Sequence, residues 1–179
     1  MKRLLTLLVT CFLALTLTAC SAFNTSNPVK QSMQLDFVKI TDSAGLVYIG
    51  AYIKESQLQS YLSQLEQHKP QMFAELREGQ IKRDHGKFHL TLINPYEYRD
   101  LTDAQKAQLT KTENITVELH GLGSVSKTSQ STFYVIATSE RAQNLRRAVG
   151  LKDKDFHITL GFTLNDIYDM RKDISTLVR

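Results

Sequence analysis

The sequence predicts an α+β domain of two similar lobes, with two largely antiparallel sheets, helices packed outside and a cleft between the sheets. Two observations favour this class. A five-residue string occurs twice, as Phe-His-Leu-Thr-Leu over residues 88–92 and as Phe-His-Ile-Thr-Leu over residues 156–160. Each copy alternates apolar and polar residues with the period of a half-buried strand. Each copy also ends a similar series of strands and helices, so the two halves of the chain echo each other.

The first half is predicted to contain a hairpin, two helices and a strand. Residues 34–40 and 46–53 are rich in strand formers and flank a turn-rich segment. A helix from Ser56 to Pro70 places Leu58, Tyr61, Leu62 and Leu65 at i, i+3, i+4 and i+7. A helical piece over 71–78 and the first histidine strand over 87–93, ended by Asn94-Pro95, complete this half.

The second half is predicted to repeat this alternation. Thr102 and Gln105 form a capping-box pattern that begins a helix ending near Lys111. The other predicted elements are a strand over 115–119 loosened by a bulge over 120–123, a strand over 132–138, a helix over 139–149, the second histidine strand over 156–162, and a last helix from about Asn165 that buries Ile167, Met170 and Ile174.

The N-terminus has the pattern of an export signal. Lys2 and Arg3 precede an apolar run that is too short for a permanent membrane span. The run closes with Leu-Thr-Ala-Cys over 17–20, which resembles the lipobox of bacterial lipoproteins and implies acylation of Cys20. The alternative is an ordinary cleaved signal beside a chance cysteine. We therefore expect a signal peptide over 1–19, a tether over 20–33 and a domain over 34–179.

Composition limits the partners and the chemistry. Removal of Lys2 and Arg3 leaves 20 basic side chains against 18 acidic ones, or about +2 in place of +4. So small an excess does not favour strong binding of long nucleic acid. Cys11 lies in the signal, so the mature chain has no pair of cysteines for a disulfide. We expect a monomer whose membrane contact is the lipid on Cys20.

Two of the five histidines share one context and are the candidate catalytic residues. Side chains at i and i+2 of a strand share a face, so His89 should point outward with Thr91, and His157 with Thr159. A single His-x-Thr is weak, but two copies with the same flanking Phe and Leu indicate a functional pair. Two imidazoles and two hydroxyls that converge across neighbouring strands suit a phosphate ester.

The sequence lacks the residues that a zinc site or nucleophilic catalysis would require. A zinc site lacks cysteines, and no carboxylate stands in phase with either candidate histidine. The chain has no nucleophile-elbow pattern, and it offers no candidate catalytic thiol.

The two motifs resemble those of the two-histidine phosphoesterase superfamily, which includes RNA 2′,3′-cyclic phosphodiesterases. The similarity covers most of the mature chain and extends to residues 48–53, 117–123 and 133–137. It implies a bilobal α+β fold with pseudo-twofold symmetry, and it implies no metal or organic cofactor.

Residue by residue, the resemblance makes His89 and His157 the acid–base pair, while Thr91 and Thr159 hold phosphate oxygens. The secondary candidates beside the cleft are Tyr134, Lys87 and Arg83. Hydrolysis requires one neutral and one protonated imidazole and hence a bell-shaped pH profile. The pseudosymmetry leaves open which histidine is the base.

The expected function is metal-independent hydrolysis of cyclic phosphates or short oligonucleotide phosphodiesters. The export signal argues against RNA ligation or tRNA maturation and places the protein in the cell envelope. In a Gram-negative cell, Ser21 after the cysteine favours the periplasmic face of the outer membrane. The alternative is a non-catalytic envelope module that binds a phosphate-bearing ligand or a protein partner.

Overall fold

The computed structural model describes residues 29–42, 44–109 and 112–178. The predicted signal peptide and Cys20 lie outside these ranges. The described elements are β1 (Gln31–Leu35), β2 (Val38–Thr41), β3 (Val47–Ile53), η1 (Glu55–Gln57), α1 (Gln59–His68), α2 (Phe73–Asp84), β4 (Phe88–Ile93), α3 (Pro95–Asp100), α4 (Asp103–Gln108), β5 (Ile115–Lys127), β6 (Gln130–Thr138), α5 (Glu140–Ala148), β7 (Phe156–Phe162) and η2 (Ile174–Thr176), where η denotes a 3₁₀ helix.

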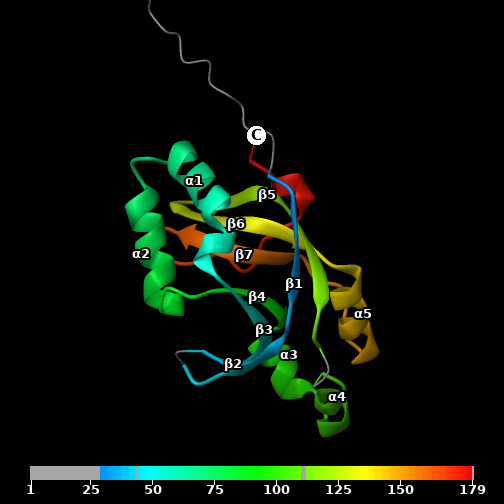
Figure 1. The fold of residues 1–179 in the computed structure, drawn as a ribbon. Coiled ribbons are helices and arrows are strands. Elements are labelled where there is room, and N and C mark those ends of the chain that lie inside the picture. Colours follow the sequence, from blue (N-terminus) through cyan, green and yellow to red (C-terminus); the bar gives the residue numbers. More distant parts are fainter. Residues whose placement is uncertain (1–28, 43, 110–111, 179) are drawn as a thin grey trace, which may run out of the picture.

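The strands form one curled antiparallel sheet in the order β1-β5-β6-β7-β4-β3-β2 (Figure 1). The α+β class is therefore confirmed. The two predicted sheets correspond to β2-β3-β4 and to β7-β6-β5 with β1 at its edge. They join where β4 pairs with β7 at Leu90 and Ile158, the central residues of the two repeats. This junction makes one continuous sheet of the two halves.

The predicted hairpin is confirmed for β2 and β3, which pair antiparallel. The predicted strand over 34–40 is nevertheless wrong as one element, because it is two strands at opposite edges of the sheet. β1 pairs with β5, whereas β2 pairs with β3. Between them Phe37 is buried, and its backbone N–H donates to Thr112 O at 3.0 Å. A pattern of apolar residues indicates which side chains are buried but not which strands pair. It therefore could not show that the chain passes from one edge of the sheet to the other between β1 and β2. β1 also begins at Gln31, so the last three residues of the predicted tether belong to the sheet.

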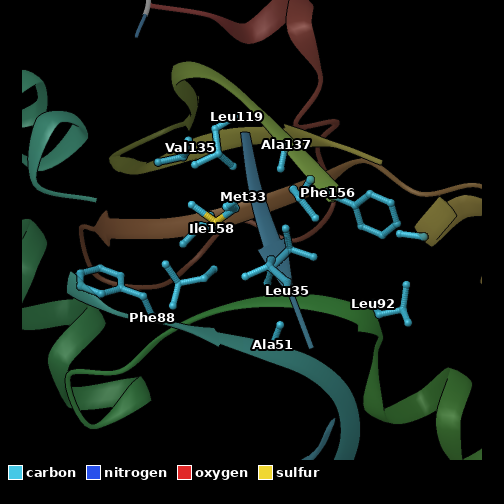
Figure 2. Close-up of a cluster of buried hydrophobic side chains, with 14 of the residues drawn as sticks. Met33, Leu35, Ala51, Phe88, Leu92, Leu119, Val135, Ala137, Phe156 and Ile158 are labelled. Atoms are coloured by element: carbon cyan, nitrogen blue, oxygen red, sulfur yellow. The ribbon is translucent and has the colours of Figure 1, made fainter. Parts of the chain in front are cut away.

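The core lies against one face of the sheet. The predicted inward side chains of both repeats, Phe88, Leu90, Leu92, Phe156, Ile158 and Leu160, are all buried. Figure 2 shows part of this core, with apolar side chains from β1, β3, β4, β5, β6 and β7 gathered together. On β6, Val135 joins this core whereas Tyr134 and Ile136 face a smaller cluster, so the predicted alternation of that strand is confirmed.

Local signals placed several element ends correctly. Thr102 caps α4 through a capping box with Gln105, and Ser139 caps α5. The predicted bulge is a register shift between Leu119 and Gly121 in the β5–β6 ladder. The strand that contains it continues to Lys127, well beyond the predicted end.

Helix α2 packs directly on β7 because glycines remove the side chains at the contact. A Cβ added at Gly79 would lie 2.5 Å from Phe162 O, and one added at Gly161 would lie 2.7 Å from Leu76 O. The helix continues past the predicted end at residue 78 as far as Asp84. Its last turn therefore brings Arg83 to the same sheet region as the repeats.

The predicted C-terminal helix is wrong. The segment after β7 contains bends and only the short η2. Leu164 has a left-handed φ of 58°, and Ile167 N donates to Thr132 Oγ1 at 3.0 Å, so the backbone bonds to the sheet and not to itself. Of the expected apolar stripe only Ile167 is buried, whereas Met170 and Ile174 are exposed.

Candidate active site

The pairing of β4 with β7 brings the two predicted motifs together. Leu90 and Ile158 are opposite each other and point into the core. In an antiparallel pair the residues on either side of this position run in opposite directions. The register therefore sets His89 toward Thr159 and Thr91 toward His157, on the face opposite the core. The two histidines lie diagonally across the junction of the two halves.

A tyrosine from a neighbouring strand lies against each histidine. The ring centroids of Tyr48 on β3 and His89 are 5.6 Å apart, and those of Tyr134 on β6 and His157 are 5.5 Å apart. Both tyrosines are buried, so each restricts the position of the imidazole that it contacts. Tyr134 Oη donates to Thr176 Oγ1 at 2.7 Å. This secondary candidate thus packs edge-on against His157 with its hydroxyl bonded elsewhere.

Both ring nitrogens of His157 have polar neighbours. Nδ1 lies 3.4 Å from the carbonyl oxygen of Asp155, and Nε2 lies 3.3 Å from Lys172 Nζ. Burial, followed by the charges of Lys172 and Lys154, lowers the pKa of His157 far below its ordinary value. His157 is therefore neutral near pH 7.

His89 lies in a different setting, at a pocket formed by β2, β3 and the end of α2. The lining includes Tyr52, Arg83, Asp84 and Lys87. Lys87 Nζ lies 5.3 Å from the centre of the Tyr52 ring, so this secondary candidate is at the pocket beside His89. Burial lowers the pKa of His89, while the nearby Asp84 charge acts to raise it.

A chain of charged side chains, buried at Asp166 and Lys172 and partly exposed at Arg83, connects the surroundings of the two histidines. Asp166 Oδ1 accepts from Lys172 Nζ at 3.0 Å, and its Oδ2 accepts from Arg83 at 2.5 Å. Arg83 also holds both carboxylate oxygens of Asp84, each at 2.7 Å. Thr159 Oγ1 lies 3.5 Å from Asp166 Oδ2. The carboxylates keep the cations in place beside the motif residues.

Sequence reasoning identified Arg83 but missed Asp166, Asp84 and Lys172. The predicted C-terminal helix would have left Asp166 and Lys172 as ordinary surface charges. Both are buried in the structure, at 8% and 3% exposure. A buried lysine has no signature in the sequence, because its burial depends on a carboxylate brought to it by the fold.

Within residues 29–42, 44–109 and 112–178, no three His, Cys, Asp or Glu side chains are grouped so that they could hold a metal ion. In the same ranges, no helix has the length and apolar character needed to cross a membrane.

The fold and the paired motifs define the class as a two-histidine phosphoesterase. A family model described as "Swiss Army Knife, 2H phosphoesterase domain" matches residues 50–168, from β3 to just beyond Asp166. The chain belongs to this family. No curated protein and no solved structure matches the chain.

Proposed function

We propose that the protein is a phosphodiesterase that hydrolyses cyclic phosphates or short oligonucleotide phosphodiesters by paired-histidine acid–base catalysis, without a metal ion. The observation that carries this proposal is the pairing of β4 with β7 at Leu90 and Ile158. It sets two imidazoles and two threonine hydroxyls around one point of the sheet. That point is where we place the phosphate.

Each group has a chemical task at this point. One imidazole takes a proton from the attacking water, while the other gives a proton to the leaving oxygen. The Thr91 hydroxyl donates a hydrogen bond to a non-bridging phosphate oxygen and stabilises the charge that develops on it. The Thr159 hydroxyl, which faces Asp166 at 3.5 Å, turns from that carboxylate to the phosphate to do the same. The two strands supply these groups from rigid positions, because the alternate residues of each strand are fixed in the core.

The local charge favours an anion. The cations around the two histidines are Lys172, Arg83, Lys154 and Lys87, and the carboxylates among them are Asp42, Asp84 and Asp166. The cations exceed these carboxylates by one before the charge of either imidazole is counted. A phosphodiester, which carries a single negative charge, would offset that excess.

We also propose that the protein works in the cell envelope, held by a lipid on Cys20. This proposal rests on the lipobox-like residues 17–20 and the basic, apolar start of the chain. Substrates met there would be small phosphodiesters or short fragments from nucleic-acid breakdown. A monomer at the periplasmic face of the outer membrane fits this role.

The test is an assay of the purified protein with nucleoside 2′,3′-cyclic phosphates and dinucleotides in EDTA. We expect turnover that survives chelation, and a loss of about 10²–10⁴-fold in kcat/KM for His89→Ala and for His157→Ala. His68→Ala is the matched control, because this exposed residue ends α1 and is not one of the repeated-motif residues. It should retain wild-type activity.

Two results would contradict the proposal. One is activity that EDTA abolishes and added divalent metal restores. The other is a folded protein that binds inorganic phosphate or a cyclic nucleotide but turns over no phosphodiester. The second result would support the non-catalytic binding module.

A further inference from the structure

A buried lysine breaks the symmetry of the two-histidine site. Lys172 is 3% exposed and lies after the residues that the family model matches. Its Nζ is 3.0 Å from Asp166 Oδ1 and 3.3 Å from His157 Nε2. The same Nζ is 5.4 Å from the centre of the Tyr134 ring, which lies against His157. The ammonium group is thus confined beside one of the two candidate catalytic imidazoles.

This contact determines which nitrogen of His157 holds a proton. A lysine ammonium has three donors and no acceptor, so Nε2 must be the acceptor. Nδ1 then holds the hydrogen and faces the carbonyl oxygen of Asp155 at 3.4 Å. An imidazole in this arrangement is neutral, with its unprotonated nitrogen beside the positively charged Lys172.

His89 has no equivalent neighbour. No lysine or arginine donates to its ring among the residues that the structure describes. Its pocket contains the Asp84 carboxylate, which favours a positively charged imidazole. The cation that accompanies this carboxylate, Arg83, is bonded to it through two nitrogens. Burial lowers the pKa of His89, and the Arg83 and Lys154 charges act in the same direction, while Asp84 and Asp166 oppose them. Because no ammonium group in the described part of the chain faces a ring nitrogen of His89, it is better placed than His157 to begin the reaction protonated.

We propose that Lys172 is a positioning residue that fixes His157 as the general base and leaves His89 as the general acid. This assignment rests on the proposed phosphodiesterase function. When substrate binds, the Lys172 ammonium turns from His157 Nε2 to a phosphate oxygen, which frees the lone pair of that nitrogen. Water then forms the new O–P bond and gives its proton to His157 Nε2. The bond from phosphorus to the leaving oxygen breaks, and the proton of His89 passes to that oxygen. The negative charge of the phosphate offsets Lys172 while His157 becomes an imidazolium.

The groups that face His157 come from every element packed against it: the cations Lys172 and Lys154, the carboxylate of Asp166, Asp155 through its backbone carbonyl, and the ring of Tyr134. Burial raises the pKa of Tyr134 to about 12, so its phenol is neutral. Burial and the two lysines lower the pKa of His157, and Asp166 opposes them. The cations outweigh the single carboxylate, which agrees with a base that is neutral before the reaction.

The first experiment follows the histidine resonances of the purified, ligand-free protein by NMR between pH 4 and 8. We expect His157 to titrate below His89 and its ¹⁵N shifts to show the Nδ1–H tautomer. Lys172→Met should raise the His157 midpoint by at least one pH unit, whereas Lys172→Arg should keep it low. Lys127→Met is the control, because Lys127 is an exposed lysine that also pairs with an aspartate, Asp169.

Three outcomes would overturn the assignment: a wild-type His157 that titrates at or above His89, an Nε2–H tautomer, or a midpoint unmoved in a folded Lys172→Met. The first two need no variant, so the test holds even if loss of the buried lysine prevents folding. None of the three requires a substrate. Failure of the assignment is therefore separate from failure of the proposed function, which the hydrolysis assay decides.

Once a substrate that the protein hydrolyses is known, the pH profile of kcat/KM provides a second test of the role of Lys172. The acidic limb reports the base of the free enzyme. It should move to higher pH by at least one unit in Lys172→Met and stay in place in Lys127→Met. A lysine that only supports the fold would lower the rate at every pH and leave the limb where it is.

Discussion

At the scale of single residues, the site depends on charges that are buried and paired. Asp166 is buried and lies between Lys172 and Arg83, while Arg83 is also held by Asp84. Removal of one partner from a buried pair leaves a charge without compensation in a medium that solvates it poorly. Removal of one partner from an ion pair at the surface lowers stability little, because water and salt screen the charge that remains.

Asp166→Asn should therefore lower the free energy of unfolding by about 3–5 kcal/mol at pH 7, measured by chemical denaturation. Asp169→Asn is the matched control. Asp169 also pairs with a lysine, but the side chains of Asp169 and Lys127 are 62% and 57% exposed. Its loss should cost less than about 1 kcal/mol. Equal losses in the two variants would show that burial of Asp166 does not matter.

The effect of Asp166→Asn on the free energy of unfolding should depend on pH. Burial acts to raise the pKa of Asp166, but the Lys172 and Arg83 charges lower it below the ordinary value of 3.8. A group whose pKa is lower in the folded state contributes stability above its unfolded pKa and loses it as pH falls through the folded pKa. The difference between wild type and Asp166→Asn should therefore shrink below about pH 4.

At the scale of elements, the position of α2 decides what stands beside His89. This helix carries Arg83 and Asp84 in its last turn and packs on β7 through Gly79 and Gly161. A glycine inside a helix is normally replaced by alanine with a gain of about 0.5–1 kcal/mol. At Gly79 the added Cβ would meet the backbone oxygen of Phe162 and not a side chain that can move.

Gly79→Ala should therefore destabilise the protein by about 1–3 kcal/mol, the cost of overpacking a close contact, in a thermal or chemical denaturation experiment. Glu78→Ala, on the exposed side of the same helix, is the control and should change stability by no more than about 0.5 kcal/mol. A stabilised Gly79→Ala would mean that α2 can move away from β7 and that its contact does not fix Arg83.

At the scale of the whole molecule, two similar halves share one sheet but differ in what surrounds their histidines. One half brings Asp84 from the end of α2, and the other brings Lys172 from the C-terminal segment. Both halves supply a tyrosine behind the imidazole. The symmetry of the motifs provides two equivalent groups. In the mechanism that we propose, the differing surroundings make one group the acid and the other the base.

The proposed envelope location requires a lipid on Cys20. We expect cells grown with labelled palmitate to label the protein, and the label to be lost in Cys20→Ser. Cys11→Ser is the matched control and should stay labelled, because that cysteine lies within the predicted signal peptide. An unlabelled wild-type protein, or label that persists in Cys20→Ser, would contradict lipidation of this residue.

The sequence alone predicts the α+β class, the two histidine strands with their inward and outward faces, and the beginnings of α4 and α5. It did not predict α3. Alternation along a strand and capping residues are local signals, so they can be read without the fold. It also determined the candidate residues His89, Thr91, His157 and Thr159, because the repetition of a five-residue string is visible in one dimension. The outcome of the proposed assays will test their roles.

Strand pairing and the burial of charged side chains could not be predicted from the sequence, because both depend on the three-dimensional fold. The division of residues 34–40 between two sheet edges, the junction of β4 with β7, and the absence of a helix after β7 all depend on partners distant in sequence. Lys172 reaches His157 only because Asp166, bonded to Arg83 on α2, compensates its charge inside the protein. A buried lysine needs a carboxylate close by, and only the folded chain brings the two residues together.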